Sequence, residues 1–131
     1  MSLVLGMLGG FIAAAVVYGL ISRRQSLPCP VWLGWLVEMD NPLARTNRAA
    51  AIIENSDIQA GMNVLDAGCG PGRVSLPAAR KVGPEGRVVA LDIQEGMLDR
   101  VREKATNEEL ENIEFRHGGL GDGHLETDTF D

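Results

Sequence analysis

Three glycines and two acidic residues have the types and the spacing that suit ligand binding best in this chain. Gly68, Gly70 and Gly72 directly follow an apolar run and directly precede a helical pattern. Glycines at such a junction let the backbone turn tightly and bring a ligand against main-chain N–H groups. Asp92 ends the next apolar run, about 20 residues beyond Gly72, where a carboxylate can accept hydrogen bonds from both hydroxyls of a ribose. The loop and Asp92 together predict an adenosine-type ligand at the carboxyl edge of a sheet.

Spacing and charge argue against a dinucleotide as that ligand. A dinucleotide fingerprint counted from Gly68 requires a glycine at position 73, where this chain has Arg73. Asp66, the second acid, stands just before the glycines, where it would repel a pyrophosphate and attract a cationic ammonium or sulfonium group. A nicotinamide-dependent oxidoreductase therefore stays only as a disfavoured alternative.

The elements that must position these residues alternate between strands and helices. We expect strands at 63–67, at 87–92 and from 113, and helices from Asn41–Pro42 to about Asn55, from about Arg73 to Val82 and through 97–105. Alternation of this kind predicts a parallel sheet with right-handed crossovers. The fold class is therefore α/β, a Rossmann-like doubly wound parallel sheet of which the chain carries the N-terminal half.

At these residues the chain resembles the class I S-adenosylmethionine-dependent methyltransferases, most of all the small relatives of quinone-biosynthesis methyltransferases. The resemblance runs from about Pro42 to Asp131, and it is specific in VLDAGCGPG, residues 64–72, and in VVALDIQEGML, residues 88–98. It implies that S-adenosylmethionine is the cofactor and that a methyl group passes to an acceptor that the sequence does not identify.

The resemblance also implies roles for individual residues. Asp66 corresponds to an acid that helps to hold the amino group of the cofactor, Asp92 to the acid that takes the ribose hydroxyls, and Ile93 to a residue that packs on adenine. Asp66 could instead only brace the loop, and Ile93 could instead only fill the core. The cofactor-binding residues implied are Asp66, Gly68, Cys69, Gly70, Gly72, Asp92, Ile93, Gly119 and Leu120.

The segment after the third strand departs from the family pattern. Relatives often carry an acidic or polar residue there, close to the adenine amino group, whereas this chain reads His117-Gly118-Gly119-Leu120-Gly121-Asp122. The adenine contact is therefore open between the backbone of Gly119 and Leu120 and a carboxylate from Asp122.

The N-terminal segment carries a different signal. Residues 3–21 include no charged residue, and as a helix they would span about 28 Å, close to the hydrocarbon thickness of a bilayer. No basic residue precedes this run, which disfavours a cleaved signal peptide, and Arg23 and Arg24 after it predict that the following domain lies in the cytoplasm. A helix buried in the domain is the alternative. The expected division is a membrane anchor at 1–24, a juxtamembrane segment at 25–40 and a methyltransferase domain at 41–131.

Composition limits the partners. The net charge of −6 disfavours nucleic acid, whose binders present a basic face. The two cysteines and two histidines have no metal-ligand spacing, so no metal site is predicted. The expected partners are a small-molecule or lipid methyl acceptor and the membrane, through residues 3–21; the sequence does not specify the oligomeric state.

The last residues, Thr129–Asp131, resemble the start of a fourth strand, which in this fold lies beside the first. The domain is therefore expected to be incomplete, and 131 residues alone are expected to lack turnover. We expect any catalytic base beyond Asp131 and identify no catalytic residue. A membrane-tethered module that binds the cofactor without turnover is a further alternative.

Overall fold

The computed structural model describes residues 10, 13–14, 16–21, 28–31, 34, 49–123, 125 and 129–131. It divides the chain into two compact units, Met1–Pro30 and Val31–Asp131. The second unit contains the sheet and the helices that connect its strands.

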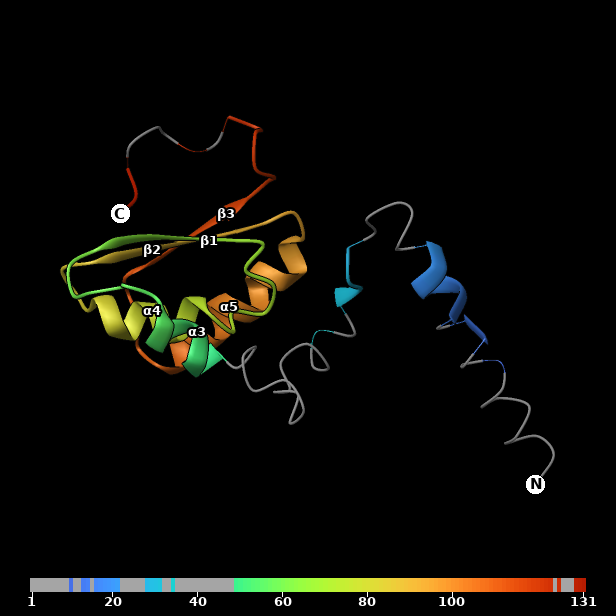
Figure 1. Ribbon diagram of the computed structural model, residues 1–131, viewed down its shortest axis with the longest axis horizontal. Coiled ribbons are helices and arrows are strands. Elements are labelled where there is room, and N and C mark those ends of the chain that lie inside the picture. Colours follow the sequence, from blue (N-terminus) through green and yellow to red (C-terminus); the bar gives the residue numbers. More distant parts are fainter. Residues whose placement is uncertain are drawn as a thin grey trace, which may run out of the picture. The chain divides into compact units, whose positions relative to one another are not determined.

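Within the second unit, helices and strands alternate and the strands form one parallel sheet (Figure 1). The elements are α3 (Ala49–Asn55), β1 (Asn63–Ala67), α4 (Ser75–Val82), β2 (Arg87–Asp92), α5 (Glu95–Asn107) and β3 (Ile113–His117). The strand order is β1-β2-β3, with Val64 beside Val88 and Val88 beside Ile113. The predicted α/β fold with a parallel sheet is confirmed, and the first two strands have the predicted bounds.

The core lies between the sheet and the helices that cover one of its faces. Figure 1 shows α4 and α5 on the same side of the sheet, as right-handed crossovers between neighbouring parallel strands require. β2 is buried from Val88 to Asp92, which explains why its sequence is apolar without alternation. The α5 side chains that pack on the sheet recur at helical spacing; they are Met97, Leu98, Val101 and Ala105.

The end of the described chain returns to the start of β1. The Asp131 N–H donates to the Asn63 carbonyl at 3.0 Å, and the Asp131 carboxylate accepts the Asn63 N–H at 2.7 Å. Residue 131 therefore lies beside β1, where the sequence predicted a fourth strand to begin.

The apolar N-terminal segment is described only in part. Residues 10, 13–14 and 16–21 are helical, and the side chains of Val16, Val17 and Leu20 are more than half exposed, at 55%, 53% and 59%. None of the helices in the described ranges is long and apolar enough to cross a bilayer. The predicted spanning helix is therefore not supported there, and the rest of that segment lies outside the described residues, as does the predicted helix start at Asn41–Pro42.

Candidate functional site

The glycine-rich loop joins the end of β1 to the start of α4. Gly68, Gly70 and Gly72 have φ angles of 74°, 52° and 86°, in the left-handed region that glycine adopts without a steric penalty. The N–H groups of Gly68 and Cys69 donate to the Leu91 carbonyl at 2.7 and 3.0 Å. These bonds hold the loop against the carboxyl end of β2.

Asp92 connects the loops that follow all three strands. Its Oδ2 accepts the Gly70 N–H and its Oδ1 accepts the Gln94 N–H, both at 2.8 Å. Its backbone carbonyl accepts the Gly118 N–H at 3.0 Å, and the residue is only 7% exposed. The three loops therefore converge on one residue, two on its carboxylate and one on its backbone carbonyl, at the carboxyl edge of the sheet, where ligands bind in open parallel sheets.

Asp66 braces the glycine-rich loop against α4. The Ser75 hydroxyl donates to Asp66 Oδ2 at 2.5 Å. Burial raises the pKa of Asp66 above its ordinary value, and the Ser75 hydrogen bond opposes that rise. The bracing that the sequence left open is thus observed, and a carboxylate retains lone pairs for a ligand beside it.

Cys69 contributes its backbone and its volume to the loop rather than a reactive thiol. The side chain is 6% exposed, and burial together with the nearby charges of Asp66 and Asp92 raises the pKa of the thiol to about 12. A thiol with so high a pKa stays protonated at neutral pH and is a poor nucleophile.

One cleft of about 260 Å³ is lined by five of the nine predicted cofactor-binding residues, Gly68, Asp92, Ile93, Gly119 and Leu120, whereas Asp66, Cys69, Gly70 and Gly72 are not among its lining residues. Its lining residues are Ala67, Gly68, Leu91, Asp92, Ile93, Gly118, Gly119 and Leu120. Ile93 and Leu120 are 56% and 69% exposed, so the alternative that Ile93 fills the core is wrong.

Gly72 does not line the cleft; it lets the loop pack closely on α5. A Cβ atom at Gly72 would lie only 2.9 Å from Cγ1 of Val101, which is fully buried. Gly70 does not line the cleft either, but its N–H donates to the carboxylate of Asp92, which does.

A family model described as a methyltransferase domain matches residues 58–131. The match contains the sheet, the glycine-rich loop and the cleft, and it covers more than half of the chain. The chain belongs to the methyltransferase domain family. The class I S-adenosylmethionine-dependent methyltransferases, to which the sequence pointed, are thereby confirmed as its family.

Individual proteins agree with the family assignment. Over 74 residues, the chain is 42% identical to a demethylmenaquinone methyltransferase of Listeria monocytogenes serotype 4a, covering 56% of this chain and 31% of that protein. A SAM dependent methyltransferase from Aquifex aeolicus matches with a TM-score of 0.66 at 26% identity, covering 79% of this chain and 55% of that one. Coclaurine N-methyltransferase bound to N-methylheliamine and SAH matches with a TM-score of 0.56 at 29% identity, covering 63% and 24%. The matched part of the chain thus spans 31%, about a third, of the length of the demethylmenaquinone methyltransferase, the curated relative.

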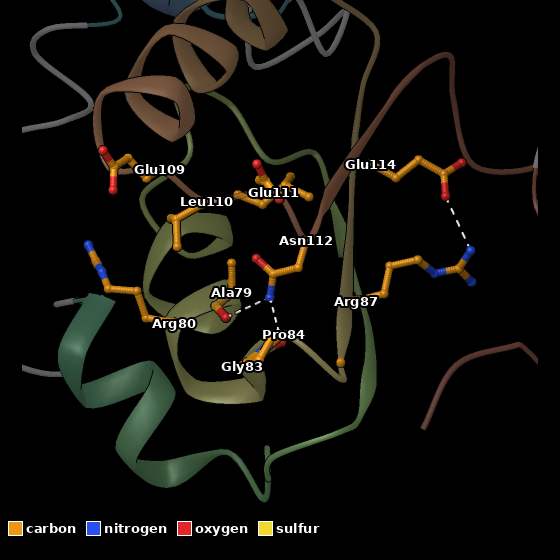
Figure 2. Close-up of a pocket in the computed structure, with 12 residues that line it drawn as sticks. Ala79, Arg80, Gly83, Pro84, Arg87, Glu109, Leu110, Glu111, Asn112 and Glu114 are labelled. Atoms are coloured by element: carbon orange, nitrogen blue, oxygen red, sulfur yellow. Dashed lines mark hydrogen bonds and ion pairs between the residues drawn. The ribbon is translucent and has the colours of Figure 1, made fainter.

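A larger pocket of about 790 Å³ lies at the opposite edge of the methyltransferase domain (Figure 2). It includes Arg87 and Ile113, the first residues of β2 and β3. Asn112 Nδ2 donates there to the carbonyls of Ala79 and Gly83 at 2.9 and 2.8 Å, which satisfies carbonyls at the end of α4. Because ligands of open parallel sheets bind at the carboxyl ends of the strands, the smaller cleft is the candidate site.

Sequence reasoning missed several residues that shape the methyltransferase cleft. Ser75 and Gln94 act through contacts with Asp66 and Asp92 that no short motif specifies. His117 ends β3, where its Nε2 lies 2.9 Å from the Ile93 carbonyl and its Nδ1 lies 3.6 Å from a Glu95 carboxylate oxygen. In the sequence, only the position of His117 at the end of a strand indicated that it would lie near the carboxyl edge of the sheet.

Proposed function

We propose that the chain binds S-adenosylmethionine in the cleft at the carboxyl edge of the sheet and transfers its methyl group to a small-molecule acceptor. The observation that carries the proposal is the buried Asp92 carboxylate among three converging loops. Each of its oxygens accepts one backbone N–H, and an ionised carboxylate offers about four lone-pair sites. Two sites therefore remain for the two ribose hydroxyls.

The negative charges of Asp66 and Asp92 suit the cationic methionine end of the cofactor. Asp66 and Asp92 are close enough that the charge of Asp92 contributes to the raised pKa of Asp66. A cationic sulfonium or ammonium group near both carboxylates would relieve that repulsion, whereas a pyrophosphate would add to it. The residues present therefore fit S-adenosylmethionine better than a dinucleotide. The proposed cofactor set remains Asp66, Gly68, Cys69, Gly70, Gly72, Asp92, Ile93, Gly119 and Leu120.

Methyl transfer requires the acceptor atom to be placed in line with the methyl group more than it requires a nucleophilic side chain of the protein. An acceptor atom forms a bond to the methyl carbon as the bond from that carbon to sulfur breaks, and the sulfonium becomes a neutral thioether. In well-oriented intramolecular reactions, placement alone contributes up to about 7 to 11 kcal/mol. We propose a quinone-type ring as the acceptor class, because the curated relative is named a demethylmenaquinone methyltransferase.

Titration calorimetry on the full chain tests the cofactor assignment. We expect S-adenosylmethionine and S-adenosylhomocysteine to bind, because the loop and Asp92 fit adenosine, and we expect no heat with NAD or NADP. Binding of a dinucleotide without either sulfur ligand would overturn the proposal. A methyl-transfer assay with quinone acceptors then separates an enzyme from a module that binds without turnover.

We also propose that residues 3–21 anchor the protein in a membrane, with the methyltransferase domain in the cytoplasm. The support is the uncharged sequence of that segment and the exposed Val16, Val17 and Leu20 side chains. Deleting residues 1–24 is expected to move the protein from the membrane pellet to the supernatant, because an exposed apolar helix partitions into lipid. An intact chain that stays in the supernatant without detergent would contradict the anchor.

A further inference from the structure

A histidine at the end of β3 joins the loops that follow β2 and β3 at the cleft. The last residue pair of the β2–β3 ladder is Asp92 beside His117. Just beyond that pair, the Gly118 N–H donates to the Asp92 carbonyl at 3.0 Å, and His117 Nε2 lies 2.9 Å from the Ile93 carbonyl. Two neighbouring carbonyls at the end of β2 are thus each contacted by a nitrogen from the end of β3.

The partners of the His117 ring determine which of its nitrogens carries a hydrogen. A backbone carbonyl only accepts hydrogen bonds, so the bond to Ile93 requires a hydrogen on Nε2. The other ring nitrogen, Nδ1, lies 3.6 Å from Oε2 of Glu95, and Oε1 of the same carboxylate accepts from Arg102 Nη1 at 2.7 Å. The first residue of α5 therefore lies beside the ring on the side away from Ile93. Both the neutral Nε2–H tautomer and the imidazolium can donate to the Ile93 carbonyl.

The contact with His117 acts on a residue whose side chain is not held by packing. Ile93 lines the cleft, and more than half of its side chain is exposed. The direction of such a side chain depends on the backbone conformation of its own residue. The His117 ring holds the carbonyl of that residue and, because the peptide unit is planar, the whole unit that follows it. An imidazole that is not among the lining residues thus helps to direct the Ile93 side chain into the cleft.

We propose that His117 is a positioning residue for the cofactor, because it holds the Ile93 backbone so that the Ile93 side chain packs on the adenine ring. The inference rests on the proposed function, in which Ile93 lies at the adenine. His117 itself contacts no ligand atom in this assignment. Loss of its Nε2–H group would release the carbonyl and let the Ile93 side chain turn from the ring, which leaves apolar area exposed to water.

Variants at position 117 test this role by titration calorimetry on the full chain with S-adenosylhomocysteine. His117→Leu removes the donor and keeps a bulky side chain. We expect its affinity to fall roughly twofold to tenfold, as for loss of one ordinary hydrogen bond. His117→Ala should show a similar loss. His117→Gln retains an N–H donor that can reach the same carbonyl and should recover most of the affinity.

A double-mutant cycle with Ile93 distinguishes positioning from a general loss of structure. Ile93→Ala removes the side chain that His117 directs, so adding His117→Leu to that variant should cost little further affinity. Thr106→Val is the matched control, because it removes another exposed bond from a side chain to a carbonyl, that of Thr106 Oγ1 to Arg102 at 2.9 Å near the end of α5. The control should bind as the wild type does, and melting curves check that each variant folds.

The outcomes separate this inference from the proposed function. If the wild type and His117→Leu bind S-adenosylhomocysteine equally tightly, His117 is not a positioning residue, and the proposed function stands. Equal losses from His117→Leu with and without the Ile93 side chain would also overturn the inference, because His117 would then act independently of Ile93. If the wild type does not bind the ligand, the proposed function and the inference fail together. Recovery in His117→Gln, together with coupling to Ile93, supports the assignment.

Discussion

Replacing Asp92 with alanine is expected to weaken the binding of S-adenosylhomocysteine by roughly a hundredfold or more. Loss of charge-assisted bonds to two ribose hydroxyls costs about 1.5 to 3 kcal/mol each. The carboxylate also holds Gly70 and Gln94 through their N–H groups at 2.8 Å, so the alanine variant releases the glycine-rich loop as well. Titration calorimetry on the wild type and the variant measures the change in dissociation constant.

The Asp92→Asn variant tests whether cofactor binding requires a carboxylate at position 92 or only a side chain of that size and shape. Both oxygens of Asp92 accept backbone N–H groups, so either orientation of an asparagine amide points its NH₂ group at an N–H donor. We therefore expect the asparagine variant also to bind weakly, although its size is conserved. Asp57→Asn, the same change at an exposed position, should leave affinity unaltered. An unchanged dissociation constant in both Asp92 variants would show that this residue does not hold the ribose.

The placement of Asp92 was predictable because it depends on local patterns. An uninterrupted apolar run marks a strand that is buried on both faces, and the residue that ends it necessarily lies at the carboxyl edge of the sheet. β2 has the predicted bounds, Arg87–Asp92, for that reason. The bounds of α4 were less accurate: the helix begins at Ser75 and not near Arg73. Its N-cap, Val74, makes no side-chain capping bond that a sequence pattern could reveal.

The contacts that shape the cleft were not predictable, because they join residues from different loops. Ser75 reaches Asp66 only once α4 packs on the sheet, and Asp122 reaches Gly119 only through the conformation of its own loop. Whether Ile93 is exposed or buried depends in the same way on whether residues from other elements pack against it. Periodicity specifies which face of an element is buried, whereas it does not specify a partner from another element.

Gly72→Ala is expected to lower the free energy of unfolding by about 2 to 5 kcal/mol, a large part of the roughly 5 to 15 kcal/mol typical of a domain. The φ angle of 86° costs an alanine about 1 to 2 kcal/mol. The new Cβ would also lie 2.9 Å from Val101 Cγ1, and overpacking of this kind costs about 1 to 3 kcal/mol. Urea melts of the full chain measure the sum.

Gly61 provides a control that separates the two costs, because its φ is 85° and a Cβ there would meet nothing within 4 Å. Gly61→Ala should therefore show the backbone cost alone, and the excess in Gly72→Ala should report the contact with Val101. Val101→Ala removes both methyl groups that the new Cβ would press on, at 2.9 and 3.1 Å, so Gly72→Ala/Val101→Ala should lose less stability than the two single variants together. Equal losses in Gly61→Ala and Gly72→Ala would mean that the loop shifts freely on α5. In that case close packing against Val101 would not be the reason for a glycine at position 72.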